Sequence, residues 1–130
     1  MIATFLTDTR AEPFAWGRTD CATWCADLVL RATGHDPAAD LRGTYDSRFG
    51  YMQILKREGG LLNVVARRMD RIPGLCPLGD ANGVAVARQD GRAICGVVLN
   101  GALITRTAGG YRIAHAGEYQ LLRGWTCHRL

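Results

Sequence analysis

The chain has 130 residues, 48% of them hydrophobic and 22% charged, which predicts one compact domain without a disordered tract. The formal net charge is +4, but the basic residues, all arginine except Lys56, are spread along the chain, so we expect no nucleic-acid partner. No stretch approaches the roughly 20 apolar residues of a membrane span, and the first residues lack the basic start of a secretory signal.

The cysteines predict free thiols and no metal site. Their number is odd and most lie within apolar runs, which fits synthesis in a reducing cytosol better than a disulfide framework. Without a Cys-x-x-Cys or His-x-x-x-His pair we expect no zinc. Gly109-Gly110 lacks the following helix of a phosphate-binding loop, so we expect no cofactor. The cysteines are Cys21, Cys25, Cys76, Cys95 and Cys127.

The N-terminal part of the chain predicts helices. Residues 2–10 form a short one, and residues 14–20 make an irregular, aromatic approach to the next. Asp20 is a good N-cap for this second helix, residues 21–33, because its carboxylate can accept from exposed amides, and Gly34 supplies a left-handed stop. The apolar positions of the second helix share one face at helical spacing: Cys21, Trp24, Cys25, Leu28 and Ala32.

Three further helical segments are expected before residue 72. Residues 36–41 predict a short helical turn, residues 47–57 a third helix and residues 61–70 a fourth, with Gly59-Gly60 as the break between the last two. The side chains expected to face inward on the third helix are Phe49, Met52 and either Ile54 or Leu55.

From residue 72 onward, turn residues alternate with short β-branched runs. Strands are predicted over residues 84–88, 93–99, 103–107 and 111–114. The turns between them are Gln89-Asp90-Gly91, Asn100-Gly101 and Ala108-Gly109-Gly110. A final turn of helix over residues 117–123 and an edge strand at Trp125–Cys127 complete the chain. Helices followed by an antiparallel meander predict an α+β fold in one domain, with a helical half (1–71) and a β half (72–130).

Cys21 is the candidate for chemistry. A thiol in the first turn of a helix lies near unpaired amides and the positive end of the helix dipole, which stabilise a thiolate. Papain-like enzymes place their nucleophile at such a position and bring a histidine base from a neighbouring strand. The same position also suits a small buried apolar residue, the role that core packing gives to Cys25, Cys76 and Cys95.

The surroundings of Cys21 carry a family resemblance. The segment Phe14-Ala15-Trp16-Gly17-Arg18-Thr19-Asp20-Cys21, with Ala26-Asp27 after it, resembles the Asp-Cys nucleophile motif of NlpC-like peptidases of the papain-like superfamily. It is closer still to their phage-encoded branch, a set of phage and gene transfer agent proteins. Further matching segments are Thr33-Gly34-His35-Asp36-Pro37, Arg42-Gly43-Thr44-Tyr45, Gly59-Gly60, Pro77-Leu78-Gly79-Asp80 and Gly124-Trp125.

The resemblance implies a fold, a setting and an activity. The fold is an NlpC-type domain in which the helix that carries Cys21 packs on a small antiparallel sheet. Such proteins are typically encoded among phage tail genes, so the implied location is the virion tail after synthesis in the bacterial host cytoplasm. The implied partners are tail hub and tip proteins and cell-wall peptide, and the family activity is hydrolysis of peptide bonds in peptidoglycan stems.

The chain departs from this family at the catalytic base. The family histidine opens the second strand, just before a glycine and a hydrophobic residue, but residues 93–97 here read Ala-Ile-Cys-Gly-Val. His35 lies at the far end of the Cys21 helix and His128 near the chain end, so His115, after a predicted strand, is the candidate substitute. Two functions stay open: a structural tail-tip protein with a decayed peptidase site, which we prefer, and an active cysteine endopeptidase.

Overall fold

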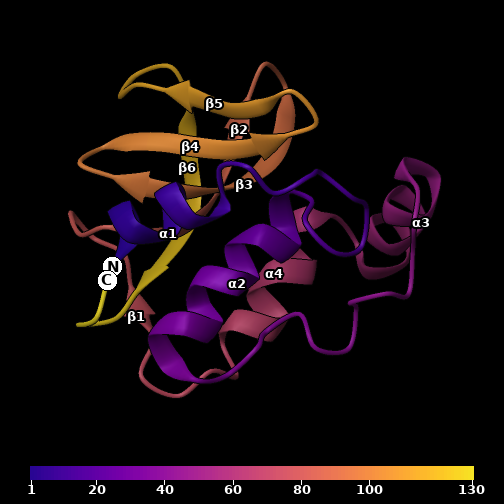
Figure 1. The fold of residues 1–130 in the computed structure, drawn as a ribbon, viewed down its shortest axis with the longest axis horizontal. Coiled ribbons are helices and arrows are strands. Elements are labelled where there is room, and N and C mark those ends of the chain that lie inside the picture. The colour runs from indigo at the N-terminus through magenta and orange to yellow at the C-terminus, as the bar shows by residue number, and fades with distance from the viewer.

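The computed structural model describes residues 1–130 as four helices followed by a six-stranded antiparallel sheet (Figure 1). The helices are α1 (Ile2–Thr9), α2 (Cys21–Thr33), α3 (Arg48–Glu58) and α4 (Leu61–Met69). The strands are β1 (Cys76–Pro77), β2 (Gly83–Gln89), β3 (Arg92–Leu99), β4 (Ala102–Thr107), β5 (Gly110–Ala114) and β6 (Gln120–Thr126), in the sheet order β1-β6-β2-β3-β4-β5. The predicted α+β class is confirmed.

The main core lies between one face of the sheet and helices α2 and α4. Trp24 and Leu28 of α2 are fully buried there against Val86 of β2 and Val97 of β3. Removing a leucine-sized side chain from water contributes about 1.5–3 kcal/mol, so this layer supplies most of the apolar burial. Helix α1 lies beside α2, where Phe5 contacts the Trp24 ring at a centroid distance of 5.3 Å.

A smaller core fills the opposite face of the sheet. Ala85 and Ala87 of β2 point to this side and are fully buried beneath Leu78 and Leu103. Strand β2 is therefore buried on both faces, which explains its unbroken apolar run. Gly124 of β6 leaves the space for Leu78, because a Cβ there would come within 2.6 Å of the leucine side chain.

The predicted turns between the strands from β2 to β4 are confirmed, and both are two-residue hairpin turns. Asp90 and Gly91 join β2 to β3 with φ values of 51° and 75°, and Asn100 and Gly101 join β3 to β4 with 51° and 83°. Two successive positive φ values match the right-handed twist of the paired strands, and asparagine, aspartate and glycine accept them at least cost.

The expected inward face of the third helix is wrong for Phe49 and Met52 and right for Ile54. Phe49 and Met52 are 72% and 49% exposed, whereas Ile54 is buried and Leu55 half-buried. Helix α3 packs on α4 and lies to one side of the sheet (Figure 1), so it has a narrow buried face. The apolar residues at 49 and 52 were assigned inward on hydrophobicity alone, and the structure leaves them at the surface.

The predicted C-terminal helical turn is also wrong. Residues 120–126 form β6, which pairs with β2 on one side and with the two-residue β1 on the other. The residues expected as an edge strand, Trp125 and Thr126, belong to this same inner strand. A bulge at Val86/Ala87 lets β6 follow the curvature of β2.

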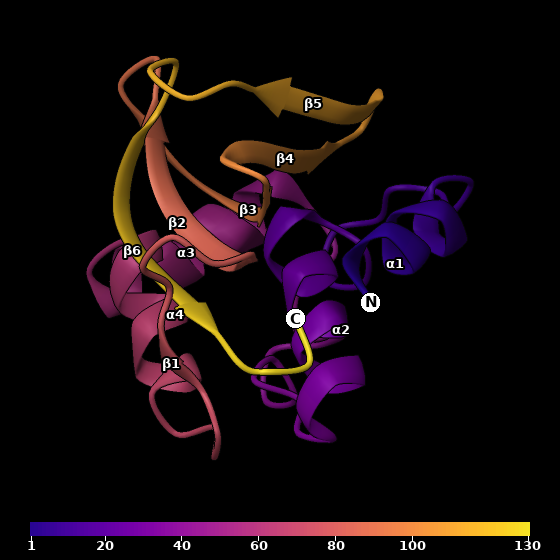
Figure 2. The ribbon, with the colours of Figure 1, turned by 90° about the vertical axis from the view of Figure 1, so that its left-hand side faces the viewer.

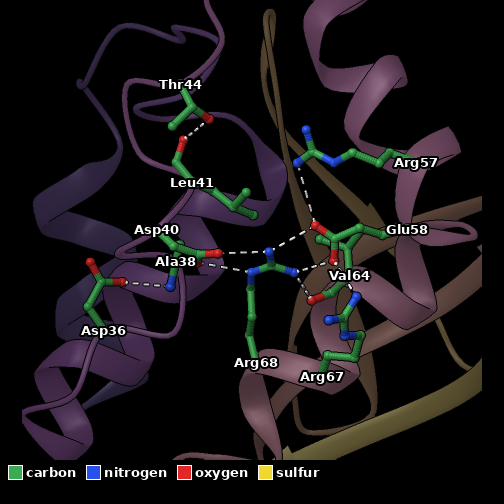
Figure 3. A network of polar contacts seen from close by, with 10 residues as sticks. All are labelled: Asp36, Ala38, Asp40, Leu41, Thr44, Arg57, Glu58, Val64, Arg67 and Arg68. Carbon is green, nitrogen blue, oxygen red and sulfur yellow. Dashed lines mark hydrogen bonds and ion pairs between the residues drawn. The ribbon is translucent and has the colours of Figure 1, made fainter.

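Residues 36–44 form hydrogen-bonded turns, as the predicted short helical turn over residues 36–41 implies, and a side-chain network fixes them (Figure 3). The Arg68 guanidinium on α4 donates to Asp40 at 2.9 Å and to Glu58 at 2.7 Å, and so ties these turns to the end of α3. None of the four helices is long and apolar enough to cross a bilayer.

Candidate functional site

The start of α2 is organised around the carboxylate of Asp20, which is fully buried. One oxygen accepts from the amides of Ala22 and Thr23 at 3.0 Å each, and the Thr23 hydroxyl accepts in return from the Asp20 amide at 3.0 Å. This capping box satisfies the exposed donors of the first turn and confirms Asp20 as the N-cap. Cys21, the next residue, is thereby fixed at the first position of the helix.

The second oxygen of Asp20 fixes the segment that approaches the helix. It accepts from the Gly17 amide at 2.8 Å and from the Tyr45 hydroxyl at 2.6 Å. The Gly17 carbonyl accepts from the Gly43 amide at 3.1 Å. A Cβ on Gly17 would lie 2.1 Å from the Tyr45 carbonyl oxygen, and its φ of +79° also favours glycine, so this close approach requires glycine.

Arg42 joins the same turns to the side of α2. Its guanidinium forms ion pairs of 2.7 Å with both Asp27 on α2 and Asp36 in the turn after it. The segments that carry the family resemblance in the first half of the chain therefore meet in space. Their charged and glycine residues hold the start of α2 in one position. This structural role explains the presence of these residues without requiring them to take part in catalysis.

Cys21 is half-buried and faces α3 and β3. Its Sγ lies 4.0 Å from the Tyr51 hydroxyl and is close to the backbone amide of Cys95. The residues just before that amide on β3, Ala93 and Ile94, line the same groove as Cys21. This is the stretch in which the resemblance to NlpC-like peptidases implies a histidine.

The thiol of Cys21 is held in its neutral form. Burial, the Cys95 thiol and the Asp20 carboxylate together raise its pKa to about 12, although the Cys95 amide and the Tyr51 hydroxyl act to lower it. Burial is the main reason that the expected thiolate is not formed, and in addition the amides of Ala22 and Thr23 donate to the Asp20 carboxylate, which lies beside the sulfur. Burial also raises the pKa of Tyr51, so this phenol stays protonated and cannot act as a base.

The groove at Cys21 has a volume of about 670 Å³ and lies between α3, the start of β3 and the end of β4. Its aromatic lining is a connected set, in which Trp16 contacts Phe14 at 5.0 Å and Tyr51 at 5.2 Å between ring centroids. Arginines supply its charge. The lining residues with charged side chains are Arg48, Arg92 and Arg106.

The structure does not bring the candidate base to the candidate nucleophile. His115 is exposed after β5, where its amide donates to Glu118 at 2.7 Å. It follows Ala114 on β5, which lies two strands from β3 and pairs with Leu103 of β4. His115 therefore lies on the order of 15 Å from the groove. His35 and His128 are exposed and line no part of the groove either.

The cysteines are unpaired, and two of them lie next to Cys21. Cys25, one turn along α2, and Cys95 on β3 are both buried in the main core. Burial raises the pKa of Cys25, and the adjacent Cys95 raises it further, so these sulfurs act as apolar core atoms. No group of three or more histidine, cysteine or acidic side chains is placed to hold a metal ion.

Several residues of the site carry no signal in the sequence. Tyr51 was part of a predicted helix, but its contact with Cys21 depends on how α3 packs. Arg48 and Arg92 stood among many scattered arginines, and only the fold places both on one groove. A charge pattern along the chain cannot reveal such a set, because the residues come from different elements.

Comparison with known proteins identifies a family but no characterised relative. Residues 1–126 match the family described as a domain of unknown function (DUF6950). No curated protein matches the chain, and no solved structure matches it either. Since the family match covers nearly all of the 130 residues, the chain belongs to the DUF6950 family of domains of unknown function.

Proposed function

We propose that this chain is an NlpC-like, papain-type domain that has lost its catalytic base and serves a structural role in a phage tail tip. The observation that carries the proposal is the setting of Cys21. The thiol stands at the start of a buried helix, opposite the first residues of β3, in a groove that no histidine lines. Without an imidazole the thiol is not deprotonated and a leaving amine is not protonated, which costs orders of magnitude in rate.

The scaffold around Cys21 supports the peptidase ancestry. A helical half followed by an antiparallel sheet, with the thiol-bearing helix packed on β3, is the arrangement that the resemblance implies. The phage-tail setting is supported by the resemblance of residues 14–45 to phage-encoded proteins. In that setting the partners are tail hub and tip proteins, and the location is the virion.

An active endopeptidase that cuts peptidoglycan stem peptides is the second candidate. One observation favours it: Cys21 is not sealed in the core but half-exposed in an open groove. In this version a group brought by a partner or by the substrate would have to supply the base, since His115 lies far from the sulfur.

Thiol alkylation separates the two candidates. Iodoacetamide labelling of Cys21 is followed by peptide mass spectrometry from about pH 6 to about pH 10, a range that spans the ordinary thiol pKa of about 8.5. We expect labelling that is slow near neutrality and still rising at the alkaline end, because the pKa of Cys21 is raised to about 12. A midpoint below pH 7 would overturn the decayed-site proposal.

Restoring a base provides the matched test. Ala93→His places an imidazole on the same face of β3 as Cys95, and Ile94→His places one on the opposite face, where Ile94 packs on the smaller core. If only the base is missing, one variant should accelerate Cys21 labelling near neutral pH, and Ala93→Gln or Ile94→Gln should not.

In a phage that encodes the protein, Cys21→Ser should leave particle assembly and infectivity intact, whereas loss of infectivity with normal assembly would favour the peptidase.

A further inference from the structure

The two strands that border the groove separate along their length. Strands β3 and β4 pair only at Val97–Leu99 with Ala102–Ile104. Beyond these pairs β3 continues along β2 and β4 continues along β5, and the groove occupies the space between them. Figure 2 shows the same divergence, with the β4–β5 hairpin crossing the top of the view while β2, β3 and β6 run downward.

This separation leaves one side of β3 without a strand partner. The Cys95 amide lies close to the Cys21 thiol, which lines the groove, so it points to this side of β3. Backbone groups of alternate residues in a strand point to the same side, so those of Ala93 also face the groove and are free of β2. A free strand edge beside a groove is a template for an added strand.

The groove is suited to an amphipathic occupant. Most of its lining is apolar, with the rings of Phe14 and Trp16 on one wall and Met52 on another. Phe49, three residues before Met52 on α3, is also 72% exposed, and residues three apart on a helix are neighbours on its surface. A contiguous exposed apolar surface of this kind is typical of an interaction site.

The charge of the groove has one sign. Arg48 and Arg92 are exposed on its rim, and neither forms an ion pair. Arg106 is 95% buried in its wall, where it donates to the carbonyls of Thr9 and Glu12 and meets no carboxylate. Its Nε has no hydrogen-bond partner at all. No acidic side chain lines the groove, and the Asp20 carboxylate, next to Cys21 in the chain, accepts from four donors of its own.

We propose that the groove holds an extended, carboxylate-bearing segment of a protein partner, which adds as a strand along the free side of β3 between Arg48, Arg92 and Arg106. This inference rests on the proposed function, because the segment is held rather than cut. Alternate side chains of the segment face the aromatic wall and the arginines in turn, so an alternation of acidic and apolar residues fits best. A nucleic acid or an anionic glycan would use the arginines without needing the free strand edge or the apolar wall.

The test is fluorescence anisotropy with a labelled peptide of about eight residues that alternates glutamate with leucine, the strand period of two. We expect saturable binding to the wild-type protein that weakens as salt rises. The double variant Arg48→Glu/Arg92→Glu should bind at least about tenfold more weakly, since both rim contacts become repulsive. The matched control is Arg71→Glu/Arg129→Glu, which changes the net charge equally at exposed arginines outside the groove and should bind as the wild type does.

Altered peptides test the mode of binding. The same peptide N-methylated at every backbone amide keeps its side chains but cannot donate to a strand edge, and a peptide of glutamate alone lacks apolar side chains. Both altered peptides should lose most of the binding. The proposal would be overturned if either bound as tightly as the original peptide, or if the two double arginine variants lost the same amount of binding. Mass spectrometry of the incubated peptide completes the design. No binding together with an unreactive Cys21 overturns this inference alone, whereas a cut peptide overturns the proposed function as well.

Discussion

Asp20 holds the segment before α2 in place and also sets the charge that Cys21 experiences. It is the one fully buried carboxylate of the chain, and it accepts from Gly17, Ala22, Thr23 and Tyr45. The amides that would stabilise a thiolate at a helix start are therefore directed at a neighbouring anion. The same residue that positions the sulfur makes its ionisation costly.

Asp20→Asn should lower the pKa of the Cys21 thiol. The substitution removes the negative charge that raises that pKa and frees part of the dipole at the start of α2 for the sulfur. It should also reduce the free energy of unfolding by about 2–3 kcal/mol, since an amide cannot satisfy the same four donors. The pH dependence of iodoacetamide labelling measures the first effect and urea unfolding the second. Asp80→Asn, at an exposed position, is the control and should change neither.

Gly17→Ala should destabilise the fold by at least about 2 kcal/mol, because the added methyl group meets the Tyr45 carbonyl in a backbone conformation that disfavours alanine. Thermal unfolding followed by circular dichroism measures the loss. Gly109→Ala provides the comparison, since its Cβ would meet only the Thr107 hydroxyl at 3.9 Å. An equal melting temperature for the wild type and Gly17→Ala would show that the approach segment is free to move away from Tyr45.

At the residue scale, features set by neighbours in the chain could be predicted from the sequence, whereas contacts between distant residues could not. The Asp20 cap, the Gly34 stop and the Asn100-Gly101 turn depend on neighbours in the chain, and the structure has all three. The bond from Tyr45 to Asp20 joins residues 25 positions apart and follows only from the packing of the turns on α2. The position of His115 relative to Cys21 likewise depends on strand order, which the sequence does not specify.

Among the elements, α3 shows where reading hydrophobicity along a helix fails. The prediction placed Phe49 and Met52 inward because they are apolar, yet α3 packs on α4 with Ile54 and leaves the other two at the surface. The prediction of a helical turn at residues 117–123 was wrong for a related reason, since most of this segment belongs to strand β6. Its exposed first half, Gln120–Arg123, lacks the alternation of a typical strand, and its place between β1 and β2 is fixed only by pairing.

The two faces of α3 should respond differently to truncation. Ile54→Ala should cost about 2–4 kcal/mol, because it leaves a cavity beside Tyr45 and Val64. Phe49→Ser and Met52→Ser should change the free energy of unfolding by no more than about 0.5 kcal/mol each, since both side chains already face solvent. Urea unfolding of the three variants measures the contrast. A loss of more than about 1 kcal/mol for Phe49→Ser would mean that α3 is rotated from its position in the structure.

Across the whole molecule, charged contacts join the parts that apolar packing leaves apart. Arg68 connects α4 to the end of α3 through Glu58 and to the turns after α2 through Asp40 (Figure 3). Arg123 on β6 reaches Asp70 at the end of α4 at 2.6 Å, and Arg42 ties α2 to the same turns. Helix α3 packs mainly on α4, and Tyr51 also contacts Trp16 and Cys21, so its position depends on α4, on these aromatic contacts and on this network.

This arrangement predicts a loss of stability in acid. Hydrogen bonds from Arg68 hold the pKa values of Asp40 and Glu58 below their usual range, and Arg123 lowers the pKa of Asp70 in the same way. A carboxyl with a depressed pKa in the folded state stabilises the protein above its unfolded pKa, about 4, and loses that contribution as the pH falls through the folded value. Asp27 acts in the opposite sense, because burial raises its pKa despite Arg42, but it is one group against three.

The free energy of unfolding should therefore be nearly constant from about pH 7 to pH 5 and fall steeply toward pH 3, with part of that slope due to Arg68. Arg68→Met keeps most of the side-chain volume and removes the partner of Asp40 and Glu58. This substitution should lower the free energy of unfolding by about 2–3 kcal/mol at neutral pH, because Glu58 is left largely buried without its cation. It should also make the fall of that free energy between about pH 5 and pH 3, the acid limb, less steep. Arg123→Met removes the partner of Asp70 alone and should flatten that limb less. Urea unfolding at each pH gives the slopes, and an acid limb as steep in Arg68→Met as in the wild type would mean that the network does not govern acid stability.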